Sequence, residues 1–214
     1  GVWHHARRIA LGTLEKEVAD STDKSAMVTR DTNLVGSWKI GAKLGQGAFG
    51  SVWEATDPSG RCAVIKALET PPGDELRALA RIAHPAVVRL LGGGAHPRPH
   101  LVMAKVEGRS LAARLTEGPL TEHQVRSVVA ALADGLAACH AAGVVHGDVK
   151  PANVVWGDAV TLVDFGLAGS TGGTLAYAAP ERLSGAVPGP AVDVYALGLL
   201  AAECLGDPVA VELL

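Results

Sequence analysis

The sequence predicts an α+β protein in which a small, mostly β part precedes a mostly α part. Between Trp38 and Val106, short runs of β-type residues are separated by turns rich in glycine and proline, and one helical stretch interrupts them. After Gly108 the apolar residues recur at helical spacing. Of the 214 residues 48% are hydrophobic, which is enough for a core and argues against disorder.

The expected elements follow this division in order. Apolar spacing predicts a short amphipathic helix over residues 1–20, and the polar residues 21–33 are interpreted as a linker. Thr121 and Gln124 fit a capping box at the start of a long helix that ends near Gly143. The predicted strands are Trp38–Leu44, Gly50–Thr56, Arg61–Leu68, Val87–Leu91, Leu101–Val106, Asn153–Trp156 and Val160–Val163; the other predicted helices are Asp74–Ala83 and Val192–Leu205.

Composition excludes several classes of function. The formal net charge is −3, so no basic surplus favours nucleic-acid binding. The longest apolar runs are too short to span a bilayer, and no membrane span is expected. Three scattered cysteines are interpreted as reduced thiols in a cytoplasmic protein.

A glycine-rich motif with the pattern GxGxxG lies at Gly45, Gly47 and Gly50. A dinucleotide-binding fold would place a helix after these glycines, but a β-type run follows here. Strand, glycine turn and strand instead predict a flap over nucleotide phosphates, because glycines let the backbone approach phosphate oxygens closely. An ordinary glycine-rich hairpin is the alternative.

A single lysine, Lys66, ends the otherwise apolar run that starts at Ala63. A lysine at a strand end can simply keep its ammonium group in water. Glu75, at the start of the next predicted helix, could pair with Lys66 and direct it at phosphates. A solvated helical glutamate is the plainer interpretation of Glu75.

Two polar motifs follow the long helix. Asp148, Lys150 and Asn153 lie within six residues, and Asp164 begins the tripeptide Asp164-Phe165-Gly166 after an apolar run. An asparagine and an aspartate at this separation on a hairpin can converge on one divalent ion. Hard oxygen ligands together with substrate phosphates suit Mg²⁺.

These motifs, ending with Ala179-Pro180-Glu181, resemble in identity and order those of eukaryotic-type serine/threonine protein kinases, bacterial members included, over Trp38 to Leu205. The resemblance implies a two-lobed kinase fold. It comprises an N-terminal extension (1–37), a five-stranded antiparallel N-lobe with one helix and the hinge (38–106), and a mostly α C-lobe (107–214) that lacks the family's last helices. It also implies ATP- and Mg²⁺-dependent phosphoryl transfer to protein serine or threonine hydroxyls.

The resemblance assigns catalytic roles residue by residue. Asp148 would accept the proton of the substrate hydroxyl, and Lys150 would steady the γ-phosphate. Lys66, held by Glu75, would bind the α- and β-phosphates. Thr174 would lie beside the catalytic aspartate and lysine.

The resemblance also assigns ligands for metal and nucleotide. Asn153 and Asp164 would bind Mg²⁺, and Asp193 would anchor the backbone of the loop that carries the catalytic aspartate. The residues implied in nucleotide binding, besides Lys66, are Leu44, Gly45, Gly47, Gly50, Val52, Ala63, Met103, Ala104, Val106 and Val155.

One departure concerns regulation, and two alternatives stay open. Gly147 stands where many kinases have an arginine that pairs with a phosphorylated activation segment, so activity is expected to be independent of such phosphorylation.

The short C-lobe would fit a non-catalytic kinase-like (pseudokinase) binding module. The sequence His146-Gly147-Asp148 also resembles small-molecule kinases of the aminoglycoside and choline type, although these usually lack the glycine loop. No motif identifies the protein substrate.

Overall fold

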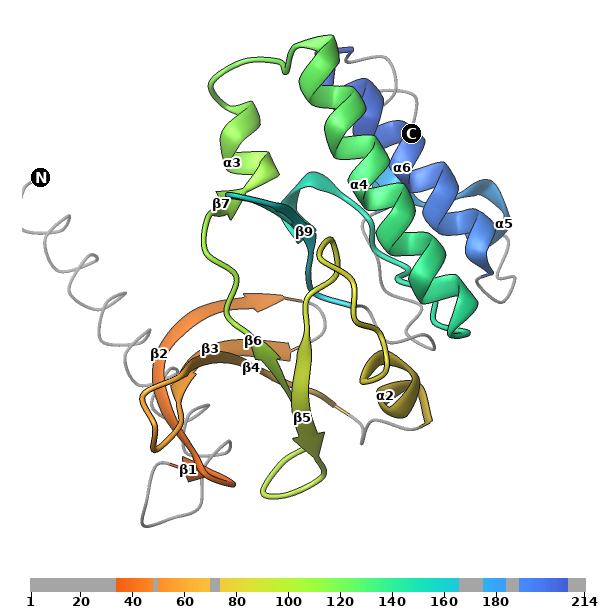
Figure 1. The fold of residues 1–214 in the computed structure, drawn as a ribbon. Helices are drawn as coiled ribbons and strands as arrows, with labels where there is room; N and C mark the ends of the chain where they lie inside the picture. The colour runs from red at the N-terminus through yellow and green to blue at the C-terminus, as the bar shows by residue number, and fades with distance from the viewer. Residues whose placement is uncertain (1–33, 48–49, 70–73, 166–174, 184–188, 208–214) are drawn as a thin grey trace, which may run out of the picture. The chain divides into compact units, whose positions relative to one another are not determined.

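The computed structural model describes residues 34–47, 50–69, 74–165, 175–183 and 189–207 (Figure 1). It divides into two compact units. The first takes in the described residues before 72 together with 93–102, and the second takes in residues 74–92 and those from 103 onward. The helix predicted over 1–20 and the linker over 21–33 lie outside the described residues.

A six-stranded sheet dominates the N-terminal half of the chain, and its order is β1-β2-β3-β4-β6-β5. The pairs β1–β2, β2–β3 and β3–β4 are antiparallel. The five predicted strands are therefore present, and a two-residue strand adds a sixth at the edge. The strands are β1 Leu34–Val35, β2 Trp38–Gly47, β3 Gly50–Thr56, β4 Cys62–Ala67, β5 Leu90–Gly94 and β6 His100–Ala104.

The period-two burial of β3 explains how this sheet forms its core. Ser51, Trp53 and Ala55 are buried on one face, while Val52 and Glu54 on the other face are half-buried. Because successive side chains of a strand point to opposite faces, the alternation fixes the register of the sheet. Ile40, Ala63 and Ile65 from the adjacent strands are buried as well.

The strand predicted over Val87–Leu91 is wrong in its bounds, because β5 begins only at Leu90. The valines before it make a different pairing. Val88 N–H donates to the Leu162 carbonyl oxygen at 2.9 Å, and Leu162 N–H donates to the Ala86 carbonyl oxygen at 2.8 Å. These buried apolar residues therefore belong to the second unit.

The helix predicted over Asp74–Ala83 is also shorter than expected, and α2 spans Asp74–Leu79. Beyond it the chain tightens into turns, since Arg81 N–H donates to the Ala78 carbonyl and Ile82 N–H to the Leu79 carbonyl. Ile82 is buried at 8% exposure in this turn. The helix predicted from apolar spacing alone is therefore longer than the helix in the structure.

The second unit combines helices with a three-stranded sheet of order β7-β8-β9. In Figure 1 the long helices α4 and α6 run side by side. Their facing apolar residues, among them Val128, Leu132, Leu197 and Leu200, build the core of this unit. The elements are β7 Arg109–Ser110, α3 Leu111–Leu115, α4 Glu122–Ala141, η1 Pro151–Asn153, β8 Val154–Trp156, β9 Val160–Leu162, η2 Leu175–Tyr177, α5 Pro180–Leu183 and α6 Pro190–Cys204.

Both ends of α4 follow the predicted signals. The Thr121 hydroxyl accepts from Gln124 N–H at 3.3 Å, and the Gln124 side chain accepts from Thr121 N–H at 3.0 Å, so the capping box is confirmed. Gly143, with φ +77°, follows the last turn. Among the described residues no helix combines the length and apolarity needed to cross a bilayer.

The capping box yields a first prediction. Thr121→Ala removes the oxygen that accepts the Gln124 N–H, and such N-cap losses cost about 1 kcal/mol. We expect urea denaturation followed by circular dichroism to show that loss in the free energy of unfolding. Ser127→Ala is the matched control, because the exposed Ser127 hydroxyl donates within α4 to the His123 carbonyl; its change should stay within about 0.5 kcal/mol. Equal losses in both variants would contradict the assignment.

Candidate functional site

A buried aspartate in the first turn of α6 holds the loop that follows α4. Asp193 is 1% exposed, and its Oδ2 accepts from His146 N–H at 2.9 Å while its Oδ1 accepts from Gly147 N–H at 2.8 Å. The His140 Nε2, from the last turn of α4, lies 2.8 Å from Oδ2. The structure thus shows Asp193 anchoring the loop backbone. The positive end of the α6 dipole favours a carboxylate at this place.

His146 ties this loop to the segment that leads to Asp164. Its Nδ1 accepts from Asp148 N–H at 3.2 Å, and its Nε2 lies 3.0 Å from the Val163 carbonyl oxygen. These partners require a neutral ring with the proton on Nε2. Burial lowers the pKa of His146, although the carboxylate of Asp193 acts in the opposite direction. The ring also packs on Phe165, with 4.5 Å between centroids.

The polar residues of the loop meet at one carboxylate oxygen. Lys150 Nζ lies 2.6 Å from Asp148 Oδ2, and Asn153 Nδ2 donates to the same oxygen at 2.9 Å. Asn153 Nδ2 also donates to the Asp148 backbone oxygen at 2.8 Å. The short helix η1 folds the chain back so that Asn153 faces Asp148. The structure therefore brings three predicted site residues into one hydrogen-bonded cluster.

The backbone places Asp164 beside this cluster. Val163 N–H donates to the Asn153 carbonyl oxygen at 2.9 Å, and the Val163 carbonyl receives the His146 ring. Asp164 itself has φ +63°, a conformation that non-glycine residues seldom adopt. Such strained residues concentrate at functional sites.

The residues near Asn153 offer only a few oxygen ligands for a hard cation. Within the described part of the chain, no group of three or more His, Cys, Asp or Glu side chains is placed to hold a metal ion. Asn153 uses Nδ2 for Asp148, which leaves Oδ1 as the oxygen the amide can offer. An oxygen donor pair from Asn153 and Asp164, completed by phosphate oxygens and water, suits Mg²⁺ rather than a metal that needs a full protein cage.

In the first unit, Lys66 lies opposite Val52 in the β3–β4 ladder and is only 2% exposed. The interpretation of Lys66 as a lysine with its ammonium in water is therefore wrong. Ala63 lies opposite Ala55 and is fully buried. The ladder thus sets Val52 and Lys66 next to each other near the glycine hairpin.

The glycines of the hairpin differ in what they do. A Cβ on Gly50 would lie 2.2 Å from the Ala67 carbonyl oxygen, and Gly50 has φ +116°, so packing and backbone both require glycine there. Gly45 pairs with Val52, and a Cβ at Gly45 would meet nothing within 4 Å. Gly47 pairs with Gly50, while residues 48 and 49 between them lie outside the described residues.

The remaining predicted residues are spread over the two units. Leu44 is exposed at 52% in β2, and Met103 is buried near the end of β6. Ala104 N–H donates to the Arg89 carbonyl oxygen at 2.8 Å. Val106 and Val155 are half-buried, Glu75 lies on α2, and Thr174 is outside the described residues.

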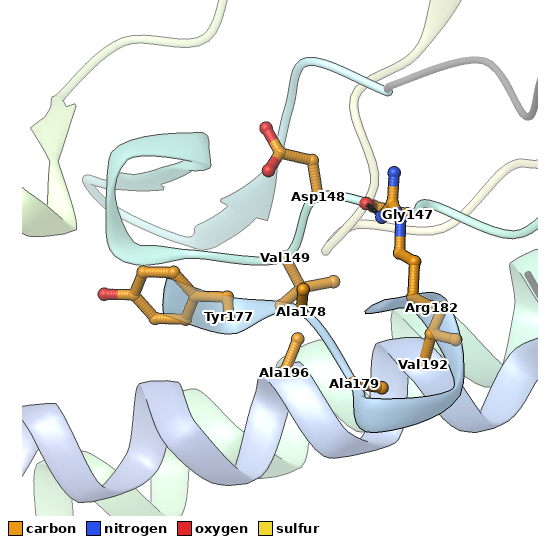
Figure 2. A pocket seen from close by; sticks show the side chains of 9 residues that line it. All are labelled: Gly147, Asp148, Val149, Tyr177, Ala178, Ala179, Arg182, Val192 and Ala196. Atoms are coloured by element: carbon orange, nitrogen blue, oxygen red, sulfur yellow. Dashed lines mark hydrogen bonds between the residues drawn. The ribbon is translucent and has the colours of Figure 1, made fainter. Parts of the chain in front are cut away.

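Figure 2 shows a pocket beside Asp148, and two of the residues that line it make contacts that the sequence did not predict. The Tyr177 hydroxyl donates to Glu203 on α6, and burial followed by this contact raises the pKa of Tyr177. The Arg182 guanidinium donates to the Gly147 carbonyl oxygen. The lining residues are Gly147, Asp148, Val149, Tyr177, Ala178, Ala179, Arg182, Val192 and Ala196.

The buried, neutral His146 predicts a pH-dependent stability. Its folded pKa lies below the ordinary value of 6.5, so the unfolded chain binds a proton that the folded protein excludes. The free energy of unfolding should keep this contribution above pH 6.5 and lose up to about 1.4 kcal/mol per pH unit as the pH falls below it. Urea denaturation between pH 7.5 and 5.5 measures the slope.

Two variants isolate the contribution of this ring. His146→Asn should flatten the slope, whereas His123→Asn, at an exposed site on α4, should leave it unchanged. An unchanged slope in His146→Asn would show that other groups carry the pH dependence.

Comparison with known proteins identifies the family. A family model described as the protein kinase domain matches residues 38–211. PkwA, a probable serine/threonine-protein kinase of Thermomonospora curvata, is 36% identical over 198 residues, which cover 80% of this chain and 26% of PkwA. PknL, a serine/threonine-protein kinase of Mycobacterium tuberculosis, is 36% identical over 192 residues, covering 78% of this chain and 48% of PknL.

A crystal structure of Rad53 in complex with AMP-PNP matches with a TM-score of 0.69 and 29% identity, over 79% of this chain and 48% of that one. The chain thus spans between a quarter and a half of the length of these proteins. The family model covers most of the chain, and the anchored loop with Asp148, Lys150 and Asn153 lies inside the matched region. This chain belongs to the protein kinase domain family.

Proposed function

We propose that the chain transfers the γ-phosphoryl group of ATP to serine or threonine hydroxyls of a protein. The observation that carries the proposal is the cluster in which Lys150 and Asn153 both bond to Asp148 Oδ2, on a loop fixed by Asp193. The relatives named as serine/threonine-protein kinases support the reaction, and the Rad53 complex with AMP-PNP supports the nucleotide.

Phosphoryl transfer requires positioning and charge neutralisation more than covalent chemistry by the protein. The Asp148 carboxylate is 3% exposed, and its two bonds at Oδ2 hold it in one orientation. In that orientation it accepts the proton of an incoming hydroxyl as general base. Lys150, bonded to the same oxygen, would neutralise charge on the transferring phosphate.

The nucleotide would use groups from both units. We assign binding of the α- and β-phosphates to Lys66, with Glu75 as its expected partner. The phosphates would approach the backbone at Gly45, where a Cβ would meet nothing within 4 Å. Asn153 and Asp164 would hold Mg²⁺, which neutralises phosphate charge when bound. Val52, Ala63, Met103 and Val155 remain the proposed apolar contacts of the adenine, and Thr174 the proposed partner of Asp148 and Lys150.

The other functions considered are less well supported. A non-catalytic kinase-like module would be expected to lack Lys66, Asp148 or Asp164, and all three are present. The named relatives are protein kinases rather than small-molecule kinases. A cytoplasmic location of this domain stays a proposal, supported by cysteines that form no disulfide.

The role of Asp148 is tested with Asp148→Asn. The amide keeps the size of the side chain but cannot accept the proton, so phosphoryl transfer should fall about 10²–10⁴-fold. Affinity for AMP-PNP should stay within about threefold, because the base acts on the acceptor and not on the nucleotide. Radiolabelled transfer to a generic protein substrate and calorimetric titration measure the two quantities. Asp134→Asn, at an exposed site on α4, is the control. Transfer at the wild-type rate by Asp148→Asn would exclude the catalytic assignment.

The metal assignment is tested by thermal shift with AMP-PNP in the presence of Mg²⁺ or EDTA. We expect a larger increase in Tm with Mg²⁺, and Asp164→Asn should abolish the difference. Asparagine tolerates the left-handed backbone of position 164, so the variant should fold. Asp158→Asn, exposed in the turn between β8 and β9, should behave like the wild type. Equal shifts with and without Mg²⁺ in the wild type would count against the site.

A further inference from the structure

The peptide group that joins Gly147 to Asp148 is held at both of its polar atoms. Its carbonyl oxygen, from Gly147, accepts from the Arg182 guanidinium, and its N–H, from Asp148, donates to His146 Nδ1 at 3.2 Å. Because a peptide group is planar, fixing the oxygen and the N–H fixes the direction in which the chain enters Asp148. Arg182 comes from α5, well separated in sequence from the loop (Figure 2).

Gly147, which contributes the carbonyl of this peptide group, is held through its backbone alone. Gly147 has φ +75° and no side chain with which to hold itself. Its N–H donates to Asp193 on α6 at 2.8 Å, and its carbonyl receives Arg182 on α5. One anionic and one cationic side chain therefore hold the two polar groups of a single glycine. Asp193 restrains only the N–H of Gly147, so the orientation of its carbonyl is set by Arg182 together with His146, which accepts from the N–H of the same peptide group.

A charged donor makes this restraint effective. Hydrogen bonds from an ionised donor are roughly twice as strong as those between neutral groups. The Arg182 side chain is half-buried and lines the same pocket as Gly147 and Asp148, which limits competition from water. A misplacement of about 1 Å at a reacting group can cost about 10²-fold in rate.

We propose that Arg182 is a positioning residue for the reaction: it orients the Gly147–Asp148 peptide and thereby aims the Asp148 carboxylate at the acceptor hydroxyl. The inference rests on the proposed phosphoryl transfer. Arg182 contacts no reacting atom in this role. Its loss should lower kcat and leave the affinity for the nucleotide unchanged.

The test compares Arg182→Met with Arg182→Lys on phosphatase-treated protein. Methionine keeps an apolar stem of similar length and removes the donor. Lysine retains a charged donor group, and one of its N–H bonds is enough for a single carbonyl. We expect kcat to fall about 10–10²-fold in Arg182→Met and at most about threefold in Arg182→Lys. The KM for ATP and the affinity for AMP-PNP should stay within about twofold in both. Arg126→Met, at an exposed site of α4 paired with Glu122, is the matched control.

A second measurement does not depend on activity. Hydrogen exchange at the Asp148 amide should be about tenfold faster in Arg182→Met than in the wild type, while exchange within α4 stays unchanged. If Arg182→Met does not fold, Arg182→Gln replaces it. This variant keeps only a neutral donor on a shorter stem, so its kcat should be lower, and exchange at its Asp148 amide faster, than in the wild type.

The outcomes separate the two proposals. No transfer by the wild type would refute the proposed function, and the exchange rates would then decide the role of Arg182 alone. Wild-type kcat and wild-type exchange in Arg182→Met would overturn the inference. A low kcat in both Arg182→Met and Arg182→Lys, together with a higher kcat of the wild type after phosphorylation, would overturn it too and would make Arg182 an anion-binding residue instead.

Discussion

The site depends on one buried carboxylate, that of Asp193. Burying an ionised group is costly unless its oxygens are satisfied, and here two backbone N–H groups and the His140 ring satisfy them. Asp193 belongs to α6, whose apolar residues share a core with α4. The loop between α4 and β8 is therefore bonded to a helix that contributes to the core of the second unit. The cost of burying the charge is offset only when the loop takes this one conformation.

From Asp193 a series of hydrogen bonds leads to the segment that carries Asp164. His146 is held to Asp193 through its backbone and reaches Val163 through its ring, and Val163 in turn bonds to Asn153. Every polar atom named in this chain of contacts has a partner, which is the condition under which a buried polar network rigidifies a protein. The two carboxylates of the second unit to which the proposed reaction assigns roles, those of Asp148 and Asp164, thus lie on segments that a single connected network holds together.

The sequence identified much of the site because its central residues lie close together along the chain. Asp148, Lys150 and Asn153 fall within six residues, and one turn of η1 is enough to bring them into contact. The sequence left two interpretations open for each of Lys66 and Gly50. A lysine at the end of an apolar run can be solvated or buried, and a glycine can serve a ligand or a close contact, so neighbouring strands decided both cases.

The sequence by itself determined the order of the elements and the local signals that begin and end them, such as the capping box of Thr121 and Gln124, because these depend on residues within one turn of each other. Only the tertiary structure decided that Val88 pairs with Leu162 instead of extending β5, and that Arg182 reaches the carbonyl of Gly147. The physical reason is that a hydrogen bond between distant segments forms only where packing brings them together. The hydrophobic periodicity of one segment does not indicate which other segment it will contact.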